Sequence, residues 1–288
     1  MPGDAAPKAC VIGWPIGHSR SPLIHGHWLK AHGITGSYEK REVPPERLRD
    51  FLLSLEREGY RGCNVTIPHK ERAFEIVSQE NPSGIGPMAR RLAAVNTIWL
   101  EQGRLHADNT DVYGFMANFR QTLPDWSAEG KNIVVLGAGG AARAIVAGFS
   151  DAGVKEITVV NRTVEKAERL IADLAGGAPL SAFGLSDLAA ALARADVLVN
   201  ATSLGMTGQP PLGVDLSPLP SGAVVADIVY APLRTPLLER AAARGLKVVE
   251  GLGMLLHQAV PGFERWFGLR PQVTDDLRRI VEADVEQC

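Results

Sequence analysis

Two serines near the start of the chain have the spacing of an anion-binding pair. Ser19 and Ser21 lie in the segment His18–Pro22, in a loop expected after the first strand. Two hydroxyls at positions i and i+2 can point at one anionic group, such as a carboxylate. An alternative is that Ser21 only caps the helix that Pro22 begins. Both roles can hold together, because Ser19 is not needed as a cap.

A second cluster, Asn64–Lys70, places a lysine where a positive charge is unfavourable. Asn64 and Thr66 alternate with apolar residues, so their side chains are expected to share one face of a strand. Lys70 follows at a helix start, where the helix dipole disfavours a cation. This misplaced charge indicates a function for Lys70, and an ordinary exposed lysine is the alternative.

A third cluster combines the segments Ala94–Thr97 and Asp108–Asp111. Asn96 supplies an amide to it. Asp111 supplies a carboxylate directly before the amphipathic stretch Val112–Phe119. Capping of that helix by Asp111 is the alternative to a function in a site.

A glycine-rich turn in the second half predicts a dinucleotide site. Gly137–Ala142 fits the pattern G-x-G-x-x-G/A, with a strand expected to end at Leu136 and a helix to follow. Gly137 permits the tight turn, Gly139 lets the backbone approach a pyrophosphate, and Ala142 keeps helix and strand close. The helix N-terminus then offers free N–H groups to the phosphates. The alternative is a glycine turn without a ligand.

The end of the next strand favours NADP over NAD. A cofactor with a free ribose 2′-hydroxyl usually meets an acidic residue about 20 residues further on, but Asn161 stands here. Arg162, Thr163 and Lys166 supply two charges and a hydroxyl, which suit a 2′-phosphate. A hydrogen bond to a charged group contributes roughly 1.5–3 kcal/mol, so two of them could favour NADP by two or more orders of magnitude. A solvated Arg162 beside a helix start is the alternative.

These clusters must be positioned by alternating strands and helices, which predicts parallel βαβ units. In the first half we expect strands at Ala9–Gly13, around Tyr38 and at Gly62–Ile67, and helices at Pro22–Lys30 and Glu46–Glu58. In the second half we expect strands at Ile133–Leu136, Glu156–Val160, Asp196–Asn200, Ala223–Ile228 and Lys247–Val249. Three helices are expected there, at Ala141–Ala152, at Thr163–Leu174 and from Thr235-Pro236 onward. Gly153 is expected to take the left-handed conformation after the first of them, and Thr163 to be the N-cap of the second.

The connections between these elements predict where the domains divide. A boundary is expected near Asp111–Gly114, where a helix begins. The tail from Leu252 indicates two more helices that pack back onto the first domain. The stretches Gln79–Ala93 and Thr207–Pro218 are rich in turn formers, so both are expected to be loops, the first near the cofactor cleft.

Length and composition exclude several classes of protein. The chain has 288 residues, enough for roughly two domains. Apolar residues make up 45 % and charged residues 22 %, a globular composition that argues against a disordered chain. A net charge of -2 argues against a basic surface for nucleic acid over the whole chain. Cys10, Cys63 and Cys288 form no C-x-x-C motif. No apolar run approaches the ~20 residues of a membrane span, and Met1–Lys8 does not resemble a signal peptide, so a soluble cytoplasmic protein is expected.

Taken together and in this order, the motifs resemble those of the shikimate dehydrogenases. The matching segments of the first half are Val11–Gly13, Pro15–Ile16, His18–Pro22, Asn64–Lys70, Ala94–Thr97 and Asn109–Asp111. Those of the second half are Gly137–Ala142, Asn161–Thr163, Asn200–Ser203, Asp227–Tyr230, Thr235–Leu237 and Gly251–Met254. The resemblance runs from Cys10 to about Phe267.

The resemblance implies reversible reduction of 3-dehydroshikimate to shikimate with NADPH, a step of aromatic amino-acid biosynthesis. It implies an α/β fold with an N-terminal substrate domain (residues 1–112 and 252–288) and a Rossmann-type, doubly wound NADP-binding domain (residues 113–251), facing a cleft. The implied catalytic acid/base is Lys70, paired with Asp111. A carbonyl that accepts hydride becomes an alkoxide, and a lysine ammonium can stabilise that charge and deliver the proton.

The resemblance also assigns ligand-binding residues. The substrate-binding residues that it implies are Ser19 and Ser21 at the carboxylate, and Asn64, Thr66, Asn96, Asp111, Tyr230 and Gln258 elsewhere on the substrate. The cofactor-binding residues are Gly137, Ala138, Gly139, Gly140, Ala141, Asn161, Arg162, Thr163, Lys166, Thr202, Ser203, Ile228 and Gly251, of which Ile228 and Gly251 lie near the nicotinamide.

Three other functions are compatible with parts of the sequence. A quinate/shikimate dehydrogenase of broader substrate or cofactor use would share these motifs, although Arg162 argues against NAD. A non-catalytic NADP-binding sensor would not need Lys70 and Asp111 together. A metalloenzyme is disfavoured, because His25 and His27 are two apart on a helix and no H-E-x-x-H motif occurs. We therefore expect a small-molecule substrate, no metal, no nucleic acid, no membrane, and a homodimer as the assembly.

Overall fold

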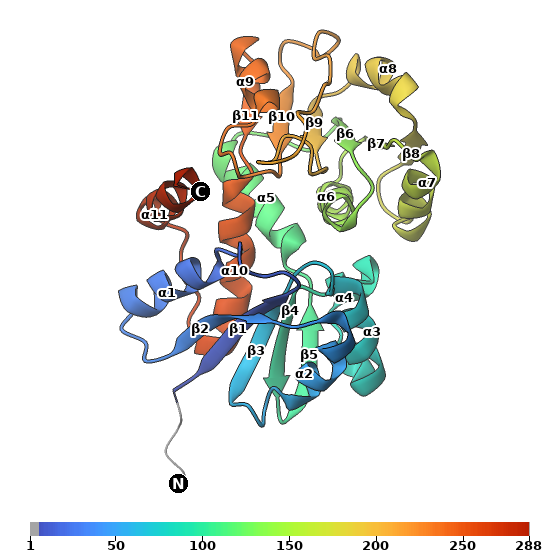
Figure 1. Ribbon diagram of the computed structural model, residues 1–288. Coiled ribbons are helices and arrows are strands. Elements are labelled where there is room, and N and C mark those ends of the chain that lie inside the picture. Colours follow the sequence, from blue (N-terminus) through green and yellow to red (C-terminus); the bar gives the residue numbers. More distant parts are fainter. Residues whose placement is uncertain (1–5, 288) are drawn as a thin grey trace. The chain divides into compact units, whose positions relative to one another are not determined.

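The computed structural model describes residues 6–287, so Cys288 and the first five residues lie outside the part considered below. The chain divides into two compact units (Figure 1). The first comprises Met1–Thr110 and Gln258–Val281, and the second Asp111–His257 and Glu282–Cys288. Among the residues described, no helix combines the length and the apolar character needed to cross a bilayer.

The first unit contains a five-stranded mixed sheet of strand order β2-β1-β3-β4-β5. Its strands are β1 (Lys8–Gly13), β2 (Ser37–Glu42), β3 (Tyr60–Val65), β4 (Thr97–Glu101) and β5 (Arg104–Asp108). β1 pairs with β2 and β3 in parallel, whereas β3, β4 and β5 are antiparallel. The three parallel strands were predicted from the sequence, and the β4–β5 hairpin was not. Its turn has positive φ at both Gln102 (53°) and Gly103 (72°), as a two-residue hairpin requires.

The helices of the N-terminal segment and the tail differ in part from the prediction. They are α1 (Ser21–Ala31), α2 (Leu48–Ser54), α3 (Lys70–Glu80), α4 (Pro87–Leu92), α10 (Leu252–Phe267) and α11 (Asp275–Glu286). The predicted helix at Glu46–Glu58 is shorter, because the segment begins with the 3-10 turn Pro45–Arg47 and ends in turns. The predicted loop at Gln79–Ala93 is wrong. Pro82 and Pro87 each begin a short helix, a position where the missing N–H leaves no hydrogen bond unmade.

Two different cores cover the faces of this sheet. One face carries an aliphatic core that includes Cys10, Ile12, Cys63 and Val65. Cys10 and Cys63 are partners in the register of β1 and β3, and both thiols are free and buried. Because side chains alternate along a strand, Tyr38, level with Ala9, faces the opposite side.

An aromatic cluster covers that opposite side. It consists of Tyr38 with His25 and Trp28 of α1 and Phe263 and Trp266 of α10. The tail is tied down by hydrogen bonds as well, since the Trp28 indole donates to the carbonyl of Gln272 and the Trp266 indole to that of Ile98. Residues 258–281 thus pack within the first unit, against α1 and its sheet.

The second unit is built on six parallel strands of order β11-β10-β9-β6-β7-β8. They are β6 (Asn132–Leu136), β7 (Glu156–Val160), β8 (Leu180–Phe183), β9 (Val197–Asn200), β10 (Val224–Asp227) and β11 (Lys247–Val249). Counted from β6, this is the order 3-2-1-4-5-6 of a doubly wound dinucleotide-binding sheet, which reverses direction between β6 and β9. The Rossmann-type fold predicted from the sequence is confirmed, with β8 as a strand that was not foreseen.

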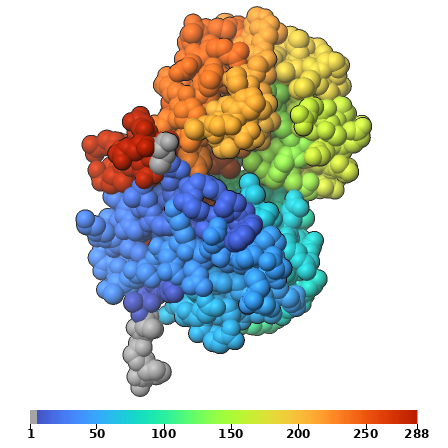
Figure 2. All heavy atoms as spheres, in the orientation of Figure 1, coloured from blue at the N-terminus to red at the C-terminus, as the bar shows by residue number. Residues whose placement is uncertain are grey.

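The helices of this unit are α5 (Asp111–Thr122), α6 (Gly140–Asp151), α7 (Val164–Asp173), α8 (Leu188–Leu192) and α9 (Pro236–Ala243). Gly153 has φ of 78°, as predicted for the position after α6. The connection between β9 and β10 is a long loop that includes the predicted loop Thr207–Pro218, and it forms part of the surface shown in Figure 2. Strands β9 and β10 are buried along their whole length.

Candidate active site

The two serines of the first cluster lie at the start of α1. Ser21 is the first residue of that helix and is buried. The residue before it is Arg20, and no side chain of the described part caps the helix, so the capping alternative for Ser21 is wrong. The hydroxyls of Ser19 and Ser21 lie 3.4 Å apart, and the Ser21 backbone N–H also points at Ser19 Oγ. Two adjacent hydroxyls are therefore available to one anionic group.

Asn64 and Thr66 lie at the carboxyl end of β3. The Asn64 side chain is buried, and its Nδ2 donates to the carbonyl of Asn96 at 3.1 Å. The Thr66 backbone N–H donates to the carbonyl of Ile12 at 2.9 Å. A Cβ at position 13 would lie 2.8 Å from Thr66 Cγ2, so Gly13 makes room for the threonine.

Lys70 is the first residue of α3, the position that the helix dipole makes unfavourable for it. The residue before it, His69, is buried with its Nε2 2.7 Å from the carbonyl of Val43. The backbone N–H of Val95 donates to the Lys70 carbonyl at 3.0 Å. The start of α3 is thus bound to the segment that carries Asn96.

Asn96 joins the second and third clusters. Its Oδ1 accepts hydrogen bonds from the backbone N–H of Thr110 at 2.8 Å and from the Thr97 hydroxyl at 3.0 Å. The Thr110 hydroxyl lies 2.8 Å from the carbonyl of Gln258. Asn64, Asn96 and Gln258 are therefore brought together within the first unit, through two threonines that the sequence analysis did not single out.

Asp111 follows Thr110 directly and is the first residue of α5, with only 8 % of its surface exposed. A different helix, α4, is bound by the neighbouring Asp108, whose Oδ1 accepts from the backbone nitrogens of Ala89, in the first turn of α4, and Asn109, both at 2.8 Å. The start of a helix is a favourable place for a carboxylate, because the helix dipole is positive there. A carboxylate can interact with a cation or with a hydroxyl.

In the second unit, the glycine turn lies at the point where the strand order reverses. Gly137 has φ of 107°, and an added Cβ would lie 3.0 Å from Thr202 Cγ2. Glycine is thus required there by the fold itself. Gly139 and Gly140 differ, because within the described residues an added Cβ at either position would meet nothing within 4 Å. Packing does not explain these two glycines, whereas close approach of a pyrophosphate to the backbone does.

The loop after β7 carries the cations predicted to bind a 2′-phosphate. Asn161 Nδ2 donates to the carbonyl of Thr163 at 2.7 Å, which closes the turn. Thr163 occupies the N-cap position of α7, as predicted, although among the residues described its hydroxyl makes no capping hydrogen bond. Arg162 and Lys166 are exposed, and neither side chain forms an ion pair within residues 6–287. Both charges are available to an anion.

A buried aspartate that the sequence analysis gave no role organises the loops after β9 and β10. Asp227 Oδ1 accepts from Asn200 Nδ2 at 2.9 Å and from the backbone of Val229 at 3.0 Å, and Oδ2 accepts from the Thr235 hydroxyl at 2.7 Å. Burial raises the pKa of Asp227 to about 6, against the effect of these hydrogen bonds. The signal in the sequence was a carboxylate that ends an apolar strand.

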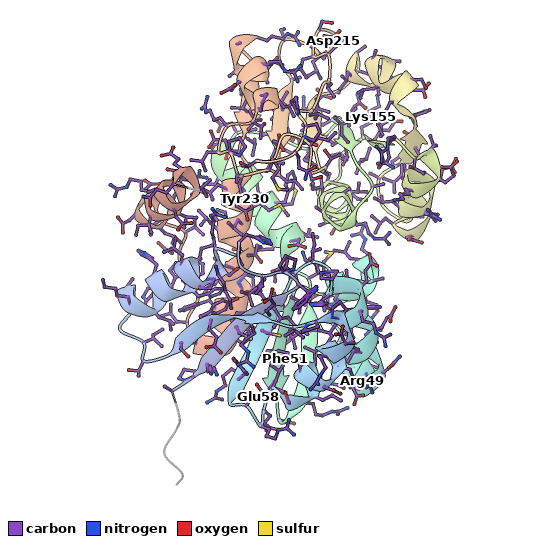
Figure 3. All side chains as sticks on the ribbon, in the orientation of Figure 1. Arg49, Phe51, Glu58, Lys155, Asp215 and Tyr230 are labelled. Atoms are coloured by element: carbon purple, nitrogen blue, oxygen red, sulfur yellow. The ribbon has the colours of Figure 1, made fainter. Side chains whose placement is uncertain are left out.

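These loops bring several of the predicted cofactor-binding residues together. Asn200 Oδ1 accepts from the backbone N–H and the hydroxyl of Thr202, at 3.0 and 2.7 Å, and Ser203 follows in the exposed part of the loop. An added Cβ at Gly251 would lie 2.5 Å from the backbone of Ile228, so the two segments touch. Tyr230, labelled in Figure 3, follows in the loop after β10.

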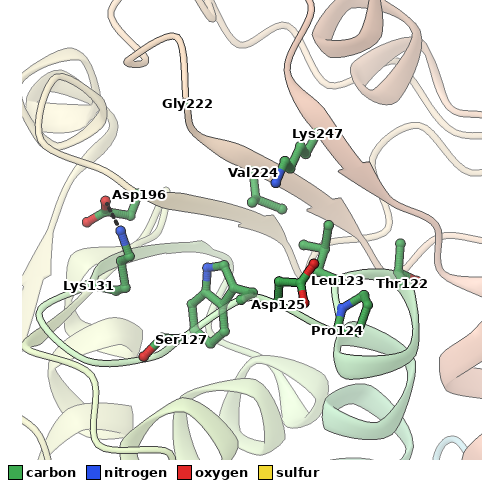
Figure 4. Close-up of a pocket in the computed structure, with 11 residues that line it drawn as sticks. Thr122, Leu123, Pro124, Asp125, Ser127, Lys131, Asp196, Gly222, Val224 and Lys247 are labelled. Atoms are coloured by element: carbon green, nitrogen blue, oxygen red, sulfur yellow. Dashed lines mark hydrogen bonds and ion pairs between the residues drawn. The ribbon is translucent and has the colours of Figure 1, made fainter.

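A cavity of about 530 Å³ in the second unit lies at the opposite ends of the strands from the glycine turn (Figure 4). Lys131 and Asp196, which precede β6 and β9, line it and form an ion pair at 3.1 Å. Lys247, the first residue of β11, lines it as well. Dinucleotides bind outside the carboxyl ends of such strands. This cavity lies at their amino ends and is therefore not the predicted cofactor site.

Models of known families match most of the chain. The shikimate dehydrogenase substrate binding domain matches residues 11–98, the shikimate/quinate 5-dehydrogenase model residues 120–206, and the shikimate 5′-dehydrogenase C-terminal domain residues 251–280. The shikimate dehydrogenase (NADP(+)) of Methylocella silvestris is 54 % identical over 284 residues, which cover 99 % of each chain.

Solved structures agree with these matches. The shikimate 5-dehydrogenase of Thermus thermophilus, in complex with NADP(H) and shikimate, superposes with a TM-score of 0.81 at 33 % identity, covering 97 % of this chain and 98 % of that one. The quinate dehydrogenase of Corynebacterium glutamicum, in complex with NAD, gives a TM-score of 0.86 at 28 % identity, covering 98 % and 99 %. By identity over almost its whole length, the chain belongs to the shikimate dehydrogenase family.

Proposed function

We infer that the protein is an NADP-dependent shikimate dehydrogenase, which reduces 3-dehydroshikimate to shikimate reversibly in aromatic amino-acid biosynthesis. The observation that carries this conclusion is the 54 % identity, over 99 % of both chains, to a shikimate dehydrogenase (NADP(+)). The exposed Arg162 and Lys166 support NADP as the cofactor, as does Asn161, which stands at the strand end where an acidic residue would accept from a 2′-hydroxyl.

The second unit has the residues to hold NADP. We propose that the glycines of the turn and the first N–H groups of α6 bind the pyrophosphate, because Gly139 and Gly140 leave the backbone uncovered. Asn161, Arg162, Thr163 and Lys166 would surround the 2′-phosphate. The proposed remainder of the cofactor site consists of Ala138, Ala141, Thr202, Ser203, Ile228 and Gly251. When bound, the reduced cofactor supplies the hydride.

The substrate is proposed to bind to the first unit. Ser19 and Ser21 would donate to its carboxylate, since their hydroxyls lie side by side. The ring hydroxyls would meet Asn64, Thr66, Asn96, Asp111 and Gln258, with Tyr230 also at the substrate. In domain terms, we propose residues 1–112 with 252–288 as the substrate domain and 113–251 as the NADP domain.

Lys70 and Asp111 are proposed to carry the proton transfer. A carbonyl that receives a hydride becomes an alkoxide, which the Lys70 ammonium would stabilise and protonate. In the reverse direction the lysine amine would accept the hydroxyl proton. Asp111 is proposed as the partner of Lys70 in this step.

A steady-state assay of NADPH formation tests the function. The purified chain would be given shikimate or quinate, each with NADP or NAD. We expect the highest kcat/KM for shikimate with NADP. Equal or better turnover of quinate, or of NAD, would show the broader dehydrogenase instead, a relevant outcome because the Corynebacterium structure is a quinate dehydrogenase with NAD. Tight binding of NADP without turnover of either acid would show a sensor.

Two further parts of the proposal concern the assembly and its location. A homodimer would give twice the mass of one chain in sedimentation equilibrium.

We propose the cytoplasm as the compartment. The Cys10 and Cys63 thiols, neighbours in the register of β1 and β3, are both free, and a reducing compartment keeps thiols in that state. Cell fractionation with an antibody against the chain tests the location.

A further inference from the structure

We propose that Tyr38 is a positioning residue, which fixes the side-chain amide of Asn64 in the orientation that substrate recognition needs. This inference rests on the proposed function, in which Asn64 binds the substrate. Tyr38 itself is 9 % exposed and stands in none of the motifs discussed above.

The two residues reach each other across β1. Tyr38 is level with Ala9 in the register of β2 and β1, whereas Asn64 of β3 is level with Val11. Ala9 and Val11 are two apart, so Tyr38 and Asn64 share the same face of the sheet. The small side chain of Ala9 lets the phenol lie over β1, where its hydroxyl donates to Asn64 Oδ1 at 2.5 Å.

The hydrogen bonds of Asn64 determine what it can offer to a ligand. Both amide protons are used, since Nδ2 donates to the carbonyl of Asn96 and to the Thr97 hydroxyl, at 3.1 and 3.3 Å. A carbonyl accepts only, so this contact defines which end of the amide is nitrogen. Oδ1 accepts the hydrogen bond from the Tyr38 hydroxyl on one of its two lone pairs. With both N–H groups used, Asn64 can offer a ligand only its oxygen, as the acceptor of a hydrogen bond from a substrate hydroxyl, and it cannot donate to a carbonyl or carboxylate.

Tyr38 is held rigidly in this position. The His25 ring stacks on the phenol at a centroid distance of 3.9 Å and an angle of 9°, and Trp266 contacts it from α10 at 5.8 Å. Burial lowers the pKa of His25 to about 3, so the stacking ring is neutral. Burial likewise raises the pKa of Tyr38, which keeps its hydroxyl protonated and able to donate.

The phenol also touches the serine pair. A hydrogen bond between Ser21 and Tyr38 acts against the rise in the pKa of Tyr38 that burial causes, so the two hydroxyls are neighbours. Tyr38 thus lies between a proposed carboxylate-binding serine and a proposed hydroxyl-binding amide.

Substitution of Tyr38 by Phe removes the hydroxyl and keeps the packed ring. We expect the KM for shikimate to rise about tenfold, with kcat within threefold of the wild type and the KM for NADP unchanged. In an Asn64→Ala background, the same substitution should change the KM for shikimate less than twofold, because the group that Tyr38 positions is gone. A merely structural tyrosine would give additive effects.

Tyr60→Phe is the matched control. Tyr60 is a buried phenol on β3 whose hydroxyl donates to Glu39 and does not contact Asn64, so the KM of this variant for shikimate should equal that of the wild type. An active wild type with an unchanged KM in Tyr38→Phe would overturn this inference alone, as would additivity in the double variant. A wild type without activity on shikimate would overturn the proposed function, and this inference with it.

Discussion

The backbone nitrogen of Thr110 donates a hydrogen bond of 2.8 Å to the side-chain oxygen of Asn96, a residue 14 positions earlier in the chain. Through this bond the segment that precedes Asp111 is tied to the segment whose backbone contacts Lys70. Asn96 therefore has a structural use in addition to its proposed contact with the substrate. The two proposed catalytic residues are thus attached to segments that share Asn96 as a neighbour.

Substitution of Asn96 by Ala should reduce both stability and turnover. It would leave the buried backbone N–H of Thr110 without its acceptor, which costs about 1–3 kcal/mol of the free energy of unfolding. It would also free the segment before Asp111, so we expect kcat to fall more than tenfold. Urea unfolding and steady-state kinetics measure the two effects.

Asn81→Ala is the control for this variant. Asn81 is equally buried, and its Nδ2 donates to the carbonyl of Leu105 at 2.9 Å, after the far end of α3 from Lys70. It should lose comparable stability and keep its kcat. A loss of stability in both variants with unchanged kcat in Asn96→Ala would contradict a role in placing Asp111.

Substitution of Lys70 by Ala should lower kcat by about 10²–10⁴-fold, the usual contribution of general acid–base catalysis. The KM values for shikimate and NADP should change little, because the lysine is proposed to act on the reacting oxygen. Lys30→Ala, an exposed lysine in the last turn of α1, is the control and should behave as wild type. If kcat stayed within a few-fold while only KM rose, Lys70 would be a binding residue.

Substitution of Arg162 by Asp should shift the preference from NADP toward NAD. The exposed guanidinium would be replaced by a carboxylate, which repels a 2′-phosphate and accepts from a 2′-hydroxyl. We expect the ratio of kcat/KM for NADP to that for NAD to fall at least 100-fold. Arg169→Asp on the exposed face of α7 makes the same change of charge and should leave the ratio near that of the wild type. An unaltered preference in Arg162→Asp would refute the role of this residue.

The parallel parts of the fold were predictable from the sequence, because buried strands and glycine turns leave strong local signals. The hairpin of β4 and β5 was missed because its turn, Gln102-Gly103, lacks the Asn-Gly or Asp-Gly signal of a two-residue loop. The loop expected at Gln79–Ala93 was wrong for a related reason. Prolines and glycines are typical both of loops and of helix starts, and here they begin helices. Only tertiary contacts, such as the hydrogen bond from the Ala89 backbone to Asp108, distinguish a helix start from a loop in this segment.

The candidate site shows the same limit. Residue types and spacing were enough to select Ser19, Asn64 and Asn96, since each belongs to a motif. Tyr38 and Asp227 act through partners 26 and 27 residues away, Asn64 and Asn200, on other strands. No local pattern encodes such a pairing, because it depends on the strand order and register of each sheet. Residues that position others are thus the ones that sequence reasoning missed.

His25 should make the protein sensitive to acid. Its pKa is lowered by burial from 6.5 to about 3, so below pH 6.5 the unfolded chain binds a proton that the folded chain does not. The stability that the neutral ring allows is complete above pH 6.5 and is lost as the pH falls toward 3. Between pH 6.5 and about 5 this loss amounts to about 2 kcal/mol.

In His25→Phe, which keeps a ring against Tyr38, the free energy of unfolding should fall less steeply over this pH range. Replacement of the exposed His32 by Gln is the control and should leave the slope as in the wild type. Urea unfolding at a series of pH values measures the three slopes, and equal slopes for the wild type and His25→Phe would show that His25 is protonated in the folded protein.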